Sequence, residues 1–278
     1  MNSNPQTRAF SLIELLVVMA IISILVGLLM PALSVGRDAA EASKCLANLR
    51  SQGQSVACYQ QDYKSYFPPY NRTDYPTPGR ITYFWGAIID SGPDIYKIDR
   101  SLSWLMNYQS SQLEMFLCPS QPWNSFVPQP DFCQETCTNY GYNGYSLDPY
   151  TTYGRVDAQG SPLPRRRIDD LPTPEKLLVF ADSGFQWRVL GVWIFQNSTS
   201  LDPVTFTTGT NRNPTNHFRH RDGTQALLAD GHAETFSWAA NWTPVNQTAP
   251  TSTAANTAAQ LRKKLGFIAA TNKPRYDQ

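Results

Sequence analysis

An almost unbroken apolar stretch from Leu15 to Met30 follows a short polar segment at the start of the chain. Extended to Leu33, it approaches the roughly 20 residues that a helix needs to cross a bilayer. No small-residue cleavage site follows it, as one would in a secretory signal. Arg8 precedes it, which favours a cytoplasmic amino terminus. The pattern predicts a membrane helix that stays on the mature protein, with the remainder of the chain outside.

Glu14 is the residue in this pattern that most needs an explanation. It adjoins the apolar stretch directly, and a charged side chain in hydrocarbon costs roughly 2.5–3.5 kcal/mol on insertion scales. Such a carboxylate is expected to have a partner. A new amino terminus at Phe10, created by a cut before that residue, would supply one.

Helical spacing continues beyond the membrane stretch. Apolar or small residues recur in steps of three and four, at Val35, Ala39, Ala42, Leu46, Leu49, Gly53 and Val56. Pro68 and Pro69 cannot continue a helix, so we expect the helix to end near Tyr63. The stripe predicts that one face of this half of the helix packs on another element.

Strand-like segments follow later in the chain. Residues 176–182 and 187–195 are rich in β-branched and aromatic side chains, and 138–145 predict a strand with a Gly-rich turn. The clearest hairpin is 224–238, where two such runs flank Asp-Gly. Residues 116–119 predict the end of a strand.

Other segments have weaker patterns. Residues 83–89 and 101–106 predict short helices or buried pieces, and 261–267 one or two amphipathic helical turns. Residues 244–260 are a Thr-, Ala- and Asn-rich tract without periodicity, which predicts a loop. The run Arg165 to Arg167 is typical of a solvated face.

Composition narrows the class of protein. Charged residues make up 16% and aromatic residues 12%, with 14 Tyr and 21 Pro. Without the first nine residues, which include one Arg, the 23 basic side chains become 22 and balance the 22 acidic ones. A nucleic-acid-binding surface would be basic, so we expect no nucleic-acid partner. The low charged fraction and the many Tyr and Pro residues favour a loop-rich extracytoplasmic domain.

Five cysteines are present, so at least one stays free or pairs between chains. Cys45 and Cys58 lie on the predicted helix about 20 Å apart and cannot pair with each other. Cys133 and Cys137 are close enough in sequence to pair. Cys118 has two candidate partners, a helix cysteine or Cys133. A zinc site is disfavoured, because the Cys133–Cys137 pair has no matching second pair.

The segment from Arg8 to Val18 resembles the leader junction of type IV prepilins and of type II secretion pseudopilins. The resemblance implies that prepilin peptidase cuts between Ala9 and Phe10 and that Phe10 is then N-methylated. Pro31 falls where this family often has a helix-kinking proline. The family usually has Gly at the position of Ala9. In a filament, Glu14 would pair with the ammonium of a neighbouring Phe10.

A second resemblance covers most of the remaining chain. His220, nine residues and Asp230-Gly231 resemble the carboxy-terminal signature of pseudopilin-like proteins expanded in planctomycetes, verrucomicrobia and lentisphaerae. The same group carries elements similar to residues 45–49, 116–119 and 140–143. The resemblance implies an α+β, pilin-like fold, with a long amino-terminal helix packed on an antiparallel β-sheet head.

These patterns divide the chain into five parts. They are the leader 1–9, the membrane or filament-core half of the helix 10–33, its extracytoplasmic half 34–63, the β-rich head 64–241, and a low-complexity loop and tail 242–278.

Polar side chains gather in the carboxy-terminal motif. Imidazole and carboxylate groups are common ligands of divalent metals, and the candidates are His220, Asp222, Asp230, His232 and Glu234. Calcium is the more plausible ion, because the major pseudopilins that the chain resembles hold it, with Asp182 a further donor. The simpler interpretation has His220 hydrogen-bonded to the hairpin backbone and Asp230 bracing the turn, with no cofactor.

The sequence predicts no enzymatic activity. Ser183-Gly184 lacks a nucleophile elbow, and no phosphate-binding loop is present. The resemblance implies a structural subunit of a type IV pilus-like or type II secretion filament. Its partners would be prepilin peptidase, sibling subunits, the assembly platform with its ATPase, and the inner membrane before assembly.

Two alternatives remain open. The first is a minor tip pseudopilin or adhesin whose head binds a secreted substrate or a glycan. The second is a membrane-tethered enzyme or metal-binding module that shares only the anchor.

Overall fold

The computed structural model describes residues 11–73, 81–92, 95–108, 113–121, 138–189, 192–196, 200–201, 216–221, 223–237 and 265–266. The chain forms two compact units, Met1–Ala40 and Glu41–Gln278. The boundary falls within one helix. The predicted limits of the five parts of the chain stay a prediction.

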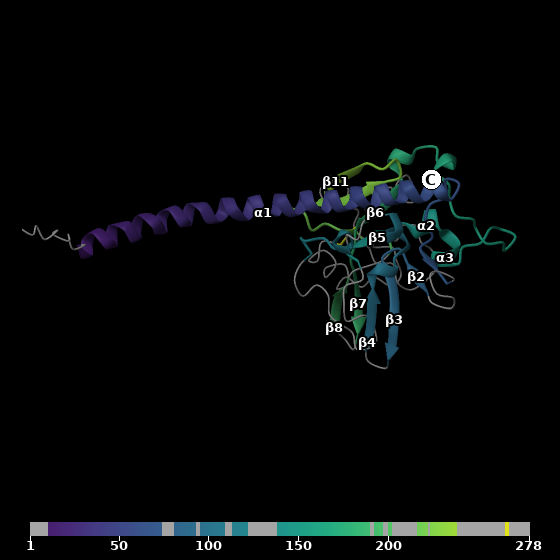
Figure 1. Cartoon of the computed structure of the whole chain (residues 1–278), viewed down its shortest axis with the longest axis horizontal. Coiled ribbons are helices and arrows are strands. Elements are labelled where there is room, and N and C mark those ends of the chain that lie inside the picture. Colours follow the sequence, from purple (N-terminus) through teal and green to yellow (C-terminus); the bar gives the residue numbers. More distant parts are fainter. Residues whose placement is uncertain are drawn as a thin grey trace, which may run out of the picture. The chain divides into compact units, whose positions relative to one another are not determined.

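The helix α1 spans Leu12–Asp62 (Figure 1). Pro31 lies inside it without ending it, although its ring nitrogen cannot donate to the carbonyl four residues earlier. The helix ends next to Tyr63, as predicted. Lys64 and Ser65 there adopt positive φ angles of 51° and 66°, and the Ser65 N–H donates to the Gln60 carbonyl at 2.8 Å, which closes the last turn.

The central sheet of the second unit is antiparallel and has the strand order β11-β10-β6-β5. Its strands are β5 (Tyr140–Tyr142), β6 (Leu178–Asp182), β10 (Gly223–Leu228) and β11 (Ala233–Ser237). The predicted hairpin is confirmed, with Leu227 paired to Ala233 beside the turn. Gly231 adopts a φ of 91° in this turn, a conformation that glycine tolerates best.

The sheet separates two apolar clusters. In the larger one, Leu49, Val56 and Tyr59 of α1 are buried together with Val179 and Leu227 of the sheet. The smaller cluster contains Ala226, Leu228, Phe218 and Phe236. Every residue of β6 and β10 is buried. A long helix followed by antiparallel sheets is an α+β, pilin-like arrangement.

The predicted helix stripe is confirmed in its later part. Leu49, Gly53 and Val56 are buried, whereas Val35 and Ala39 are exposed. An ideal Cβ at Gly53 would lie 2.8 Å from Cδ1 of Leu227. Glycine at this position therefore lets the helix approach β10 closely.

Smaller sheets and short helices complete the described part of the second unit. The strands are β1 (Asn71–Arg72), β2 (Thr82–Tyr83), β3 (Gly86–Gly92) and β4 (Ile95–Asp99) in one sheet, the ribbon β7 (Phe185–Val189) with β8 (Val192–Gln196), and the pair β9 (Asn216–His217) with β12 (Leu265–Gly266). The helices are α2 (Gly144–Leu147), α3 (Pro149–Tyr153) and the 3-10 turns η1 (Arg100–Leu102), η2 (Trp104–Tyr108), η3 (Leu113–Phe116), η4 (Ile168–Asp170) and η5 (Pro174–Lys176).

Several local predictions differ from the structure. The predicted strand end at 116–119 is wrong, because the 3-10 turn η3 ends at Phe116. Side chains of α1 donate hydrogen bonds to the backbone carbonyls of this region, at Met115 and Leu117. Residues 83–89 are not helical but lie largely in strands β2 and β3, while the predicted burial is confirmed at Phe84, Trp85 and Ala87. Within 261–267 the structure describes 265–266, which form β12 against β9 rather than a helical turn.

The arginine run supports the end of α1 instead of forming a purely solvated face. Nη1 of Arg165 donates to the Tyr59 hydroxyl at 3.1 Å, and Nε of Arg167 donates to the Lys64 carbonyl at 3.1 Å. The Phe67 N–H donates to the Arg166 carbonyl at 2.9 Å. These bonds join the carboxyl end of the helix to the segment that precedes β6.

Candidate functional site

The start of α1 holds Glu14 in a local hydrogen bond. The Ser11 N–H donates to Oε2 of Glu14 at 2.8 Å, and the Glu14 N–H donates to the Ser11 carbonyl at 3.1 Å. A Glu three residues into a helix often binds an unpaired N–H in this way. Ala9 and Phe10 lie outside the described residues, so the cut between them and the Phe10–Glu14 pair stay predictions.

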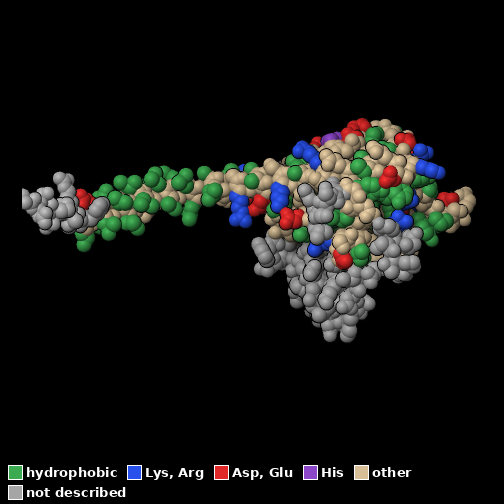
Figure 2. Space-filling model, in the orientation of Figure 1, with side chains coloured by type: hydrophobic (Ala, Val, Ile, Leu, Met, Phe, Trp, Pro, Cys, Tyr) green, Lys and Arg blue, Asp and Glu red, His purple; other side chains and the backbone are tan. Residues whose placement is uncertain are grey.

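The first unit has an exposed apolar surface. Residues 11–40 are all exposed, and apolar side chains predominate along α1 from Leu12 to Val35 (Figure 2). The helix is long and apolar enough to cross a membrane, with a mean hydropathy of 2.9 in its most apolar window. An apolar surface of this extent indicates contact with lipid or with other protein.

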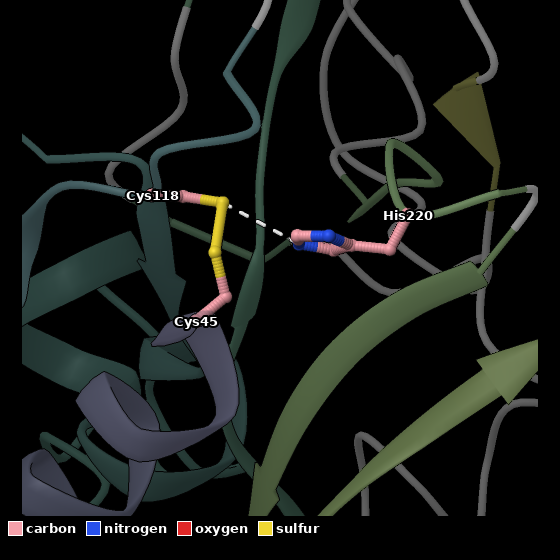
Figure 3. Close-up of side chains that lie close together, drawn as sticks. All are labelled: Cys45, Cys118 and His220. Atoms are coloured by element: carbon pink, nitrogen blue, oxygen red, sulfur yellow. Dashed lines mark hydrogen bonds between the residues drawn. A yellow bond between two sulfur atoms is a disulfide. The ribbon is translucent and has the colours of Figure 1, made fainter. Parts of the chain in front are cut away.

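A disulfide links α1 to the segment before the central sheet. Cys45 and Cys118 are bonded with their Cα atoms 5.4 Å apart (Figure 3). Further along the same helix face, Nδ2 of Asn48 donates to the Leu117 carbonyl at 2.9 Å, and Nε2 of Gln52 donates to the Met115 carbonyl at 2.8 Å. Residues 115–118 are thus attached to three positions of the helix.

The other side of the disulfide faces an imidazole. Nε2 of His220 lies 3.4 Å from Sγ of Cys118 and points toward it in Figure 3. The same nitrogen lies 3.2 Å from Oδ2 of Asp182. The side chains of His220 and Asp182 are 2% and 0% exposed, so this polar group is enclosed beside the apolar core.

Arg219 completes the buried group. Its Nε lies 3.7 Å from Oδ1 of Asp182, and its Nη2 donates to the Ser183 carbonyl at 2.6 Å. The Gln225 N–H donates to Oδ2 of Asp182 at 2.7 Å. Burial lowers the pKa of the Arg219 guanidinium, while the Asp182 charge opposes that shift. Burial and the Asp182 charge raise the pKa of the Tyr140 hydroxyl well above its usual range.

The geometry of this group does not match a cysteine-histidine-aspartate relay. Such a relay needs the carboxylate on one ring nitrogen and the sulfur on the other. Here Nε2 of His220 faces both groups, whereas Nδ1 is buried without a hydrogen-bond partner among the described residues. The two sulfurs and the imidazole lie within 4.8 Å of one another. In the disulfide the sulfurs are not thiolates, and only after reduction would they be zinc ligands.

The hairpin turn carries a second, exposed group. Nδ1 of His232 lies 2.6 Å from Oδ1 of Asp230, and its Nε2 lies 3.7 Å from Oε1 of Glu234. The His232 N–H also donates to Oδ1 of Asp230 at 3.1 Å. Asp230 therefore orders the turn through a neighbouring backbone amide, which is a common role of Asp in turns.

The five candidate metal ligands of the carboxy-terminal motif do not lie together. Asp230, His232 and Glu234 meet at the turn, while His220 lies beyond the opposite end of β10. At about 3.3 Å per residue, the ends of this six-residue strand are roughly 16 Å apart. Asp222 lies outside the described residues. Calcium binding stays a prediction.

Side chain and backbone of His220 have separate partners. The backbone pairs with Gly223, with both N–H···O distances 2.9 Å. The imidazole turns away to Asp182 and the disulfide rather than to the hairpin backbone. Of the two partners that the sequence left open for Cys118, a helix cysteine is the one bonded, whereas Cys133 and Cys137 lie outside the described residues.

Sequence reasoning missed two members of the buried group. Arg219 directly precedes the motif histidine, His220, but belongs to no recognisable sequence motif. Asn139 accepts the Cys118 N–H through Oδ1 at 2.7 Å and gave no motif signal. In the sequence, Asp182 is a charged end to an apolar strand, and the only role predicted for it is that of a metal ligand. Asp182 and Arg219 are 37 positions apart in the sequence, and no local pattern indicates that they pair.

A family model matches the start of the chain. Residues 4–30 carry the prokaryotic N-terminal methylation motif. The matched residues include Phe10, Glu14 and most of the exposed apolar surface. No curated protein and no solved structure matches the chain.

The methylation motif and the apolar helix together fit a prepilin-like protein anchored in a membrane. The match ends at residue 30. The carboxy-terminal resemblance through His220 and Asp230 therefore stays a prediction.

Proposed function

We propose that this chain is a structural subunit of a type IV pilus-like or type II secretion filament. The observation that carries the proposal is the methylation motif at residues 4–30, joined to an exposed apolar helix whose first turn contains Glu14. The motif implies processing by prepilin peptidase and assembly with other pilin subunits. The apolar part of α1 would lie in the inner membrane first and in the filament core afterwards.

The local bond of Glu14 supports an assembly role for its carboxylate. One oxygen, Oε2, accepts the Ser11 N–H, and a carboxylate has further lone pairs for a second donor. After a cut before Phe10, the ammonium of a neighbouring subunit would provide that donor. Each charge then offsets the burial cost of the other, and the subunits are held at one register.

The construction of the second unit supports a structural role for the head. The Cys45–Cys118 disulfide and the Asn48 and Gln52 bonds attach the helix to residues 115–118. A head joined in this way to the later part of α1 would move together with that part of the helix when subunits assemble. The assembly platform and its ATPase are the further partners of this function.

The proposal is tested by the Glu14→Ala variant, produced together with a pilus or secretion assembly system. We expect the precursor to enter the membrane as the native chain does, because a charge has been removed from an apolar segment. We expect recovery of the protein in sheared and sedimented filaments to fall at least tenfold.

Ser23→Ala is the matched control. It also removes a polar group from the exposed apolar stretch, where the Ser23 hydroxyl bonds the Met19 carbonyl of its own helix at 2.7 Å. Its assembly should remain native. Normal filament recovery for Glu14→Ala would contradict the proposed function.

A further inference from the structure

We propose that the reduced head binds a zinc ion through Cys45, Cys118 and His220, with Asp182 as the fourth ligand. The site would replace the disulfide when a dithiol reductant is present. This inference concerns the second unit alone and does not depend on the filament role.

Two distances measured from Nε2 of His220 match those between neighbouring ligands of one zinc ion, whereas the three ligand atoms that all lie within 4.8 Å of one another are those of Cys45, Cys118 and His220. Zinc bonds of about 2.3 Å to sulfur and about 2.0–2.1 Å to nitrogen place the two ligand atoms about 3.6 Å apart. The observed distance from Nε2 to Sγ of Cys118 is 3.4 Å. A carboxylate oxygen and a nitrogen on zinc lie about 3.4 Å apart, and Oδ2 of Asp182 lies 3.2 Å from Nε2.

The ligands are positioned by bonds other than the disulfide. The Cys118 N–H donates to Oδ1 of Asn139 at 2.7 Å, and Asn48 and Gln52 bond the preceding carbonyls. The Gln225 N–H holds the Asp182 carboxylate at 2.7 Å. Reduction would therefore release the two sulfurs to rotate apart while their backbones stay in place.

The charges of the site balance. Two thiolates neutralise the zinc ion, and the negative charge of Asp182 is matched by Arg219, whose Nε lies 3.7 Å from Oδ1. The side chain of Arg219 is 1% exposed. A neutral group of this kind avoids the cost of an uncompensated buried charge.

The redox step is an ordinary thiol–disulfide exchange. A dithiol attacks the Cys45–Cys118 bond and becomes a disulfide itself, and both protein sulfurs become thiols. Zinc then binds, and the two thiol protons are released to water. Oxidation to the disulfide removes both sulfur ligands, so the two states exclude each other.

The test uses the full chain in detergent micelles. One sample keeps the disulfide, and the other is reduced with a phosphine and freed of the reductant without air. We expect about one zinc ion per reduced chain and none per oxidised chain. Cobalt(II) in place of zinc should give thiolate-to-metal charge-transfer absorption in the reduced sample, which reports sulfur ligation without any substitution.

Variants locate the site. Cys45→Ser and His220→Ala should each weaken zinc binding by more than about 100-fold. Loss of a residue that only supports a ligand costs at most about that much. Cys58→Ser, and the double variant Cys133→Ser with Cys137→Ser, should bind zinc as the native chain does. Circular dichroism of each reduced variant checks that the fold is kept.

Three results would overturn the proposal. They are a reduced native chain that binds no zinc, an oxidised chain that binds it equally well, and a binding signal lost in the Cys133/Cys137 variant but kept in His220→Ala. If His220→Ala does not fold, the cobalt(II) spectrum of the reduced native chain tests the site. A spectrum without thiolate-to-metal bands would also overturn the proposal.

Discussion

Asp182 is the residue on which most of the buried polar contacts converge. It ends the apolar strand β6 and lies within reach of the Arg219 guanidinium, the His220 imidazole and the Gln225 N–H. These groups come from β10 and from the segment before it. One carboxylate thereby joins two strands and the disulfide region, and its loss would leave a buried cation without its counter-charge.

We expect Asp182→Asn to lower the free energy of unfolding by about 3–5 kcal/mol, the usual cost of removing one partner of a buried ion pair. Urea titration of the disulfide-bonded chain in micelles measures it. Asp169→Asn is the control, because the Arg167–Asp169 pair is exposed and such pairs are worth at most about 1 kcal/mol. Equal effects of the two substitutions would refute the assigned role of Asp182.

The buried carboxyl of Asp148 is expected to make the stability of the head depend on pH. Its side chain is buried, and Oδ2 accepts the Tyr70 N–H at 2.8 Å. Burial raises the pKa of this carboxyl above its usual value, against the effect of that hydrogen bond. The folded state therefore holds the proton more tightly than the unfolded state does.

It follows that the Asp148 contribution to stability is complete below the ordinary carboxyl pKa of about 4 and is lost as pH rises through the raised value. Asp148→Asn keeps an acceptor for Tyr70 but cannot titrate. We expect a smaller loss of stability above pH of about 4 in this variant, measured by urea unfolding across a pH series. If Asp148→Asn has the same pH profile of stability as the native chain, Asp148 does not cause the loss of stability above pH of about 4.

At the scale of elements, the main contact is between the later part of α1 and the sheet. Leu49, Gly53 and Val56 pack on it, and Cys45, Asn48 and Gln52 fix residues 115–118 to the helix. Apolar packing and polar attachment use adjoining faces of the same helix turns. The disulfide is the covalent part of this attachment.

We expect Cys45→Ser to destabilise the head by roughly 4 kcal/mol, the loop-entropy value for a bridge across 73 residues. The shift of the urea midpoint measures it. Cys58→Ser should leave the midpoint unchanged, because Cys58 is exposed and free in the described part of the chain. A Cys45→Ser midpoint equal to that of Cys58→Ser would mean that the disulfide does not stabilise the fold.

The sequence predicted elements whose signals are local. The continuous helix and the hairpin around Asp230-Gly231 follow from spacing and turn chemistry. The conformation of residues 116–119 could not be predicted from local signals, because side chains of α1 some 65 residues away along the chain bond this region. The predicted hydrogen bond from the His220 side chain to the hairpin backbone is wrong for the same reason, since its partner Asp182 lies on another strand.

At the scale of the whole molecule, the chain combines an exposed apolar unit with a cross-linked head. The first unit, Met1–Ala40, contains the methylation motif, and the second, Glu41–Gln278, contains the disulfide and the buried ion pair. Assembly and membrane insertion are expected to depend on the first unit. Stability, pH response and metal binding are expected to depend on the second.

The most direct test is the mass and amino-terminal sequence of the chain recovered from membranes of cells that also produce prepilin peptidase. The account predicts a chain that begins at Phe10 and carries one added methyl group on its terminal amine, and a full-length precursor when the peptidase is inactive. A chain that keeps Met1, or is cut elsewhere, in the presence of active peptidase would contradict it.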